Sequence, residues 1–181
     1  DVMERNIGEI SRHLSSSKIG HKRPDVDAFS QDYPLLPVRR RFWESTLRAL
    51  DTTGTDSQLR NQLSMVNKAI QTNIDEDLGN VIPADFLYFE SAPKLLQARI
   101  LPRKVYDLTM RWKEGSSDEV LLSRACALIF LINKLKGENN ELGVTATVDS
   151  IADLLVQDLS SGSASLRSKL PGLLDNCSLL M

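Results

Sequence analysis

The chain has 181 residues, of which 41% are hydrophobic and 25% are charged, and its formal net charge is −2. This composition is typical of a globular protein and excludes a disordered chain or a bundle of membrane-spanning segments. The small negative charge argues against attraction of the whole molecule to nucleic acid or anionic lipid, so any such binding would have to be local.

The sequence carries no signal peptide, and its longest apolar run, residues 125–133, is too short to span a bilayer. Cys126 and Cys177 lie far apart in apolar surroundings, which favours two buried thiols over a disulfide. We therefore expect a soluble, cytoplasmic protein that does not contact a membrane. Both ends of the chain are amphipathic or apolar, which is typical of a piece cut from a larger protein.

Residues 1–31 are expected to form an N-terminal helix followed by a loop. Ile7, Ile10 and Leu14 fall on one side of a helix over residues 5–14. From Ser15 to Asp32 the periodicity is lost and glycine and proline appear, so this stretch is interpreted as a linker-like loop.

Residues 32–115 are expected to form a helical subdomain. Two prolines in residues 32–37 precede a helix with the apolar face Trp43, Leu47 and Leu50. Thr55 and Gln58 have the spacing of a capping box, and a stripe of apolar residues at helical intervals follows them: Leu59, Leu63, Val66 and Ile70. Residues 86–89 could form a helix or a strand, with a helix favoured, and helical spacing returns over residues 95–112.

Residues 116–181 are expected to form a separate three-helix module. Ser116 and Glu119 make a second capping box before an almost wholly apolar helix that ends near Leu135 and should be the central buried one. Thr147 caps a short helix, and another helix begins at Ser163 or Ser165. Residues from Cys177 onward could begin a strand. These lengths and connections are typical of a helix-turn-helix or winged-helix body, so the predicted fold class is mainly all-α.

Motifs of catalysis and cofactor binding are missing. The sequence has no phosphate-binding G-x-x-x-x-G-K-[ST] or G-x-G-x-x-G loop and no G-x-S-x-G nucleophile elbow. It also lacks H-E-x-x-H, C-x-x-C and EF-hand spacings, and its two histidines, His13 and His21, are eight residues apart across a probable loop. We therefore predict no catalytic residue, no metal site, no bound cofactor and no enzymatic activity for the chain by itself.

Basic residues supply the candidate binding groups. Arg39, Arg40 and Arg41 lie at the start of a helix, where they could contact a phosphate or a partner, or could form a solvated turn with Asp32 and Glu44. Arg60 lies off the apolar stripe of its helix, where a guanidinium could pair with a phosphate or a carboxylate, although the residues alone favour plain solvent exposure.

DNA contact would have to use Arg167 and Lys169, the two basic residues of the last predicted helix. Residues 141–181 contain five acidic and two basic side chains, and Pro171 and Gly172 are expected to interrupt that helix. This module is therefore interpreted as a structural or protein-contacting unit in preference to a DNA-reading one.

Several segments resemble the large P-loop ATPase of bacterial BREX phage-defence systems, the BrxC/PglY family. The resemblance covers most of the chain from Asp32 onward and rests on the runs DYPLLP at 32–37, RFWE at 41–44, LRALD at 47–51, SQLRNQL at 57–63, GNVIPAD at 79–85, LLQARILP at 95–102 and LINKL at 131–135. That family is similar to AAA+ ATPases, in which a nucleotide-binding core is followed by a helical lid and, in one branch, by a winged-helix domain.

The resemblance implies that residues 32–115 are lid-like and that residues 116–181 are a winged-helix-like module, truncated before its wing. Arg60 would then occupy the place of a sensor arginine, which reaches the γ-phosphate side of a nucleotide. ATP and Mg²⁺ would belong to the parent protein, because the Walker motifs of the family are absent here. The implied partners are the ATPase core of the same chain, the other BREX components and DNA through the full complex. The alternatives are a helix-turn-helix DNA-binding regulator and a helical scaffold for protein contacts.

Overall fold

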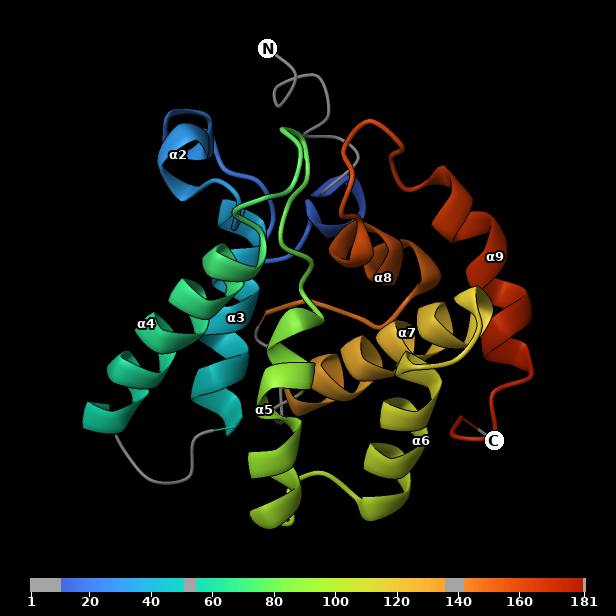
Figure 1. Cartoon of the computed structure of the whole chain (residues 1–181). Helices are drawn as coiled ribbons and strands as arrows, with labels where there is room; N and C mark the ends of the chain where they lie inside the picture. Colours follow the sequence, from blue (N-terminus) through green and yellow to red (C-terminus); the bar gives the residue numbers. More distant parts are fainter. Residues whose placement is uncertain (1–10, 51–54, 136–141, 181) are drawn as a thin grey trace.

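The computed structural model describes residues 11–50, 55–135 and 142–180, with only the backbone described for residues 55–59, and the described part is helical (Figure 1). Its elements in chain order are η1 (Arg12–Leu14), α2 (Asp25–Asp32), α3 (Pro37–Leu50), α4 (Thr55–Thr72), α5 (Phe86–Gln97), α6 (Arg103–Lys113), α7 (Ser117–Leu135), α8 (Val148–Leu155) and α9 (Ala164–Asp175). Within these ranges β pairing is limited to isolated bridges at Leu78, Asn80 and Asp158. The predicted all-α class is confirmed.

Helix α7 is the centre of the fold, as predicted, and it contacts α3, α5, α6, α8 and α9 (Figure 1). The predicted capping box starts it: the Ser116 backbone N–H donates to Glu119 Oε2 at 2.8 Å, and the Glu119 N–H donates to Ser116 Oγ at 3.4 Å. Ala125, Leu128 and Leu131 have no exposed surface. A helix that is apolar on nearly all sides is stable only when other helices cover it, which explains the central position of α7.

One hydrophobic cluster extends from Leu14 to Leu170 and takes residues from both sides of Gly115. A bidentate ion pair also joins residues on the two sides of Gly115. Arg124 of α7 donates to Asp85, directly before α5, with Nε–Oδ2 and Nη2–Oδ1 distances of 2.8 and 3.1 Å, and it also donates to the Leu155 carbonyl at 2.9 Å. The division of the chain at residues 31 and 115, and the winged-helix arrangement of the last module, stay predictions.

The predicted loop over residues 15–32 is wrong in its second half, which forms α2. Asp25 and Phe29 are buried on this helix, and Phe29 packs in a small cluster with Leu36 and Val81. Tertiary contacts therefore stabilise a helix that has no apolar periodicity in the sequence. The preceding helix, predicted over residues 5–14, falls mostly outside the described residues, and its described end is the 3₁₀ turn η1.

Two predictions near the C-terminus are also wrong. Helix α9 is not interrupted at Pro171 and Gly172 but continues to Asp175. Pro171 lies on the exposed side of α9, where water can hydrate the carbonyl that loses its helical donor. Residues 177–180 form a turn and not a strand, because the Leu180 N–H donates to the Cys177 carbonyl at 3.0 Å.

The unbroken helical spacing predicted over residues 95–112 is wrong at residues 98–102, where the chain turns between α5 and α6 and Arg99 has a φ of 59°. The other helix predictions agree with the structure to within a few residues. Residues 86–97 are helical, so the favoured alternative for residues 86–89 is confirmed, and the helix includes Pro93. The Thr147 cap is also confirmed, since Thr147 Oγ1 accepts the Ser150 N–H at 3.2 Å. The side chains of the Thr55–Gln58 capping box lie outside the described residues, although α4 does begin at Thr55.

Candidate functional site

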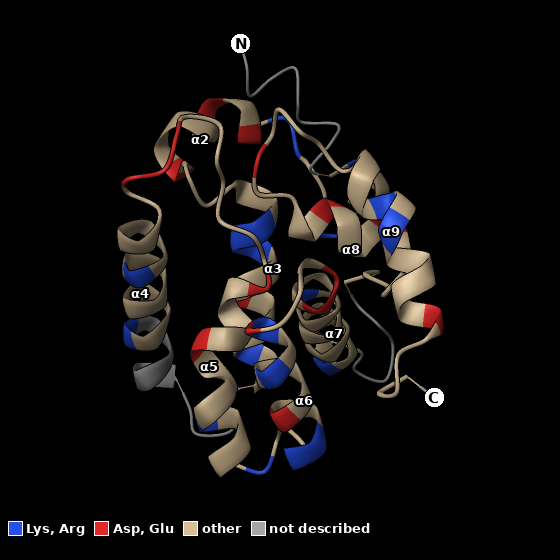
Figure 2. Cartoon of the chain, turned by 45° about the vertical axis from the view of Figure 1, so that its right-hand side comes forward, with Lys and Arg blue, Asp and Glu red and all other residues tan. Residues whose placement is uncertain are grey.

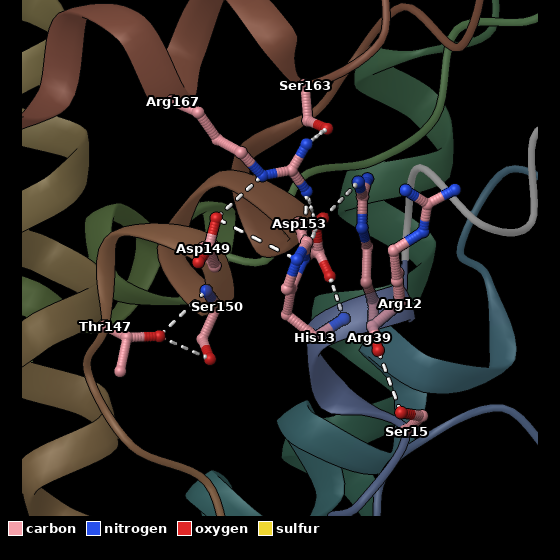
Figure 3. Close-up of polar contacts among 10 residues, drawn as sticks. All are labelled: Arg12, His13, Ser15, Arg39, Thr147, Asp149, Ser150, Asp153, Ser163 and Arg167. Carbon is pink, nitrogen blue, oxygen red and sulfur yellow. Dashed lines mark hydrogen bonds and ion pairs between the residues drawn. The ribbon is translucent and has the colours of Figure 1, made fainter.

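A polar cluster forms where η1, α8 and α9 meet, and we call it the Asp153 cluster: His13, Asp149, Asp153, Ser163 and Arg167 (Figure 3). Asp153 has no exposed surface. Its carboxylate accepts the His13 backbone N–H at 2.9 Å and the Arg167 guanidinium. Arg167 Nε also lies 3.0 Å from Asp149 Oδ1, and Arg167 donates to Ser163 Oγ. The guanidinium thus connects both carboxylates of α8 to the start of α9.

The sequence of α8 produces this arrangement. Asp149 and Asp153 are four residues apart, so both carboxylates lie on one face of a helix whose other residues are mostly apolar and buried. Burial raises the pKa of Asp153, although the His13 N–H and the charges of Arg167 and His13 act in the opposite direction. Burial dominates here, so ionisation of Asp153 is less favourable than it is in water.

The chemistry open to the Asp153 cluster is limited by the partners of His13. The His13 ring is 3.5 Å from Asp153, 3.9 Å from Asp149 and 3.1 Å from Arg167 through its nitrogens. A histidine oriented by a carboxylate can act as a base, but such a base must also face a nucleophile or a substrate proton. The ring partners here are carboxylates and a guanidinium. The hydrogen bonds and ion pairs of the Asp153 cluster therefore hold η1 and α9 against α8.

The sequence pattern did not indicate this cluster. Asp149 and Asp153 are two of the five acidic residues counted in residues 141–181, and His13 was expected beside a probable loop. No local signal could have found it, because Asp153 lies opposite the apolar stripe Val148, Ile151 and Leu155, where a solvent-exposed side chain is expected. Its partners come from positions 140 residues earlier and 14 residues later, which no local pattern can indicate.

Arg39, predicted to contact a phosphate or a partner, is completely buried. Its guanidinium donates to the carbonyls of Ile82 at 2.6 Å, Asp153 at 3.3 Å and Val156. Burial lowers the Arg39 pKa to about 9. Arg39 therefore stabilises the C-terminal end of α8, and its buried guanidinium is not accessible to a phosphate or a partner.

Arg40 and Arg41 are paired within the chain. Arg40 lies 3.1 Å from Asp32 and 3.3 Å from Glu44, the two carboxylates named in the solvated-turn alternative. Arg41 forms a bidentate pair with Asp25 at 2.8 and 2.7 Å and also donates to the Ile19 and Gly20 carbonyls. Burial alone would raise the pKa of Asp25, but the hydrogen bonds from Arg41 and from the Lys22 N–H and the charge of Arg41 lower it.

Arg60 differs from these three arginines, because it is exposed. Its helix, α4, lies at the edge of the molecule (Figure 1, Figure 2). Within the part of the chain that the structure describes, no carboxylate pairs with its guanidinium. Of the residues predicted to bind a phosphate, Arg60 is thus the one that is exposed and has no ion-pair partner among the described residues.

The apolar stripe predicted for α4 is only partly its buried face. Ala69 is buried and Met65 and Val66 are partly buried, whereas Leu63 is 63% exposed and Ile70 is 37% exposed. Exposed apolar side chains continue into the following loop at Ile74 and Leu78. We call Arg60, Leu63, Ile70, Ile74 and Leu78 the α4 surface. Exposed large apolar residues mark a contact surface where they form a contiguous patch, whereas single ones are common on any protein.

Arg167 and Lys169, the predicted DNA contacts, have different surroundings. Arg167 forms ion pairs with Asp149 and Asp153 inside the Asp153 cluster, whereas Lys169 is exposed on α9. Elsewhere, basic and acidic residues are interspersed along the helices (Figure 2). On α6, for example, Arg103 pairs with Asp107 at 3.1 Å.

Over the described ranges, His, Cys, Asp and Glu side chains do not gather in any group of three that could hold a metal ion. None of the helices described is both long and apolar enough to cross a membrane. Comparison of the chain with protein-family models, with curated proteins and with solved structures gave no match.

Proposed function

We propose that the chain is the non-catalytic lid and winged-helix-like segment of a large AAA+-type ATPase in bacteriophage defence, and that it couples nucleotide state to the engagement of a partner or DNA. The proposal rests on the resemblance of residues 32–135 to the BREX ATPase, and an all-helical fold is compatible with a lid. ATP, Mg²⁺ and the phosphate-binding loop belong to the rest of the parent protein in this proposal.

The observation that carries the proposal is the contrast among the arginines. Arg39, Arg40 and Arg41 all bind groups of the chain itself, whereas Arg60 is exposed without an ion-pair partner among the described residues. A guanidinium offers five N–H donors in a planar fork that matches the oxygens of a phosphate. In the proposed complex, Arg60 points from α4 toward the nucleotide on the ATPase core.

The apolar residues of the α4 surface would supply the contact area around that arginine. Burying one leucine or isoleucine side chain completely stabilises a contact by about 1.5–3 kcal/mol. Leu63 and Ile70 follow Arg60 by three and ten positions, so they flank it on one side of α4. A docked core would then cover residues that are otherwise exposed to water.

The packing of α4 offers a route for coupling. Helix α4 contacts α3 and α5, both of which contact α7, and α7 contacts α8 and α9. A displacement of α4 upon nucleotide exchange would therefore reach the C-terminal module through packed helices. The Arg124–Asp85 ion pair reinforces this connection, because it joins α7 to the start of α5.

Hydrogen exchange in the intact parent ATPase tests this docking. We expect a non-hydrolysable ATP analogue to slow amide exchange in residues 60–72, and Leu63→Asp to abolish that protection. Leu180→Asp is the matched control, since Leu180 is also an exposed leucine, 47% accessible, but lies outside the α4 surface. Equal exchange in residues 60–72 with and without the analogue would contradict the proposal.

A helical scaffold for protein contacts is the second candidate, and the exposed apolar residues of the α4 surface favour it. Such a scaffold would use α4 to bind a protein without regard to nucleotide. The same exchange experiment separates the two functions, because a scaffold would protect residues 60–72 when its partner is added and would not respond to the ATP analogue.

A further inference from the structure

The two cysteines of the chain are in contact inside the protein. Cys126 lies in the middle of α7 and Cys177 follows α9, and their Sγ atoms are 3.6 Å apart. Both thiols are free and buried, and Trp112 shares their cluster. A disulfide bond is about 2.05 Å long, so the two sulfur atoms would have to approach by about 1.5 Å to form one.

We infer that Cys126 and Cys177 form an oxidative modification site, at which a small-molecule disulfide such as oxidised glutathione converts the two thiols into one intramolecular disulfide. The bond would join the end of α9 directly to the central helix. Neither cysteine belongs to the α4 surface, since Cys126 lies on α7 and Cys177 follows α9, and the inference does not depend on the proposed function.

The surroundings of the two thiols set the order of reaction. Cys177 lies in a short surface turn, between the exposed residues Asn176 and Ser178, so a local opening of this turn brings it to solvent. Cys126 is held within α7, and burial, followed by the nearby Cys177, raises its pKa. Cys177 is therefore the thiol that meets the oxidant first.

The reaction is two successive thiol–disulfide exchanges. The Cys177 thiolate attacks one sulfur of oxidised glutathione, which forms a mixed disulfide and releases one glutathione thiolate. The Cys126 thiolate then attacks Sγ of Cys177, which closes the protein disulfide and expels the second glutathione. The two protons lost by the cysteines appear on two molecules of glutathione, which carry the two electrons removed from the protein.

The bond would stabilise the C-terminal part of the fold. It closes a loop between positions 51 residues apart, and that loop contains the whole of α8 and α9. Cross-linking a loop of this length restricts the unfolded chain. We expect the melting temperature of the oxidised chain to exceed that of the reduced chain by at least about 5 °C.

The test is a redox titration of the purified chain in mixtures of reduced and oxidised glutathione, continued until the count of free thiols is constant. Intact mass should then show the loss of two hydrogens, and digestion without reductant should give one peptide pair linked through Cys126 and Cys177. Melting with and without dithiothreitol should show the increase in stability. Cys126→Ala and Cys177→Ala are the controls, and in both the increase should disappear.

Three results would overturn the inference. Both thiols could remain free when the count is constant, the oxidised protein could carry glutathione adducts or links between two chains in place of the internal bond, or the internal bond could form without raising the melting temperature. The wild-type chain alone distinguishes these outcomes, so the test does not depend on the folding of either variant.

Discussion

Arg39 of α3 and Val156 at the end of α8 are hydrogen-bonded in the interior although 117 positions separate them in the sequence. The same guanidinium also binds the carbonyls of Ile82 and Asp153. The last carbonyls of a helix carry partial negative charge and lack helical donors, so they accept hydrogen bonds from this guanidinium although burial lowers the Arg39 pKa. Arg39 thus connects α3, α8 and the segment before α5.

Replacing Arg39 should destabilise the fold severely. Arg39→Met keeps much of the side-chain volume but leaves three buried carbonyls without a donor, and each lost partner costs about 1–3 kcal/mol. We expect the free energy of unfolding, measured by urea denaturation, to fall by at least about 3 kcal/mol. Arg48→Ala, at an exposed position of the same helix, should change it by no more than about 0.5 kcal/mol. A loss below about 1 kcal/mol for Arg39→Met would show that water replaces the guanidinium.

Asp158 should titrate well below an ordinary aspartate. Hydrogen bonds from the Ser160 side chain, the Ser161 side chain and the Ser160 N–H lower its pKa from 3.8 to about 2. Because the folded-state pKa is below the unfolded value, the stabilisation that this carboxylate provides is present above pH 3.8 and is lost as the pH falls toward 2. Carboxyl NMR titration should give a pKa near 2 in the wild type.

The paired variant Ser160→Ala with Ser161→Ala supplies the control for that titration. It removes both hydroxyl donors but keeps the Ser160 N–H, so the Asp158 pKa should move back toward 3.8 without reaching it fully. An Asp158 pKa that is equal in the two proteins would mean that the hydroxyls do not bind the carboxylate in solution.

The chain alone should not bind DNA strongly. Arg167 is committed to Asp149 and Asp153, which leaves Lys169 as the exposed basic residue of α9. In a gel-shift experiment at physiological salt we expect no shift of a DNA duplex below about 10 µM chain, since non-specific affinities of DNA-binding proteins lie around 10⁻⁴ to 10⁻⁶ M. A shift at lower concentration that Lys169→Ala abolishes would support the DNA-binding regulator instead.

Local sequence signals predicted the helices that local physics determines. The capping boxes and apolar periodicity located α3, α7 and α8, because side-chain capping and a buried face stabilise each of them over a short range. The central position of α7 was predicted for the same reason, since its sequence is apolar on nearly every side.

Features that depend on distant partners were not predictable. Helix α2 is stabilised by the ion pair between Asp25 and Arg41 and by the packing of Phe29 in a hydrophobic cluster with residues of other segments. On α4, the sequence could not distinguish the buried residues from Leu63 and Ile70, because an apolar side chain is equally compatible with a core and with a contact surface. The Asp153 cluster needs three elements that only the tertiary fold brings together.

The most direct test of the central claim is ATP turnover by the intact protein that we propose to be the parent ATPase, carrying Arg60→Ala and compared with Arg103→Ala as an exposed arginine on α6. Because Arg60 is exposed, the substitution should leave the melting temperature unchanged. The account predicts that Arg60→Ala lowers turnover by more than about tenfold, as expected when an arginine no longer reaches the transferred phosphate, whereas Arg103→Ala has no effect. Unchanged turnover in the Arg60→Ala protein would contradict it.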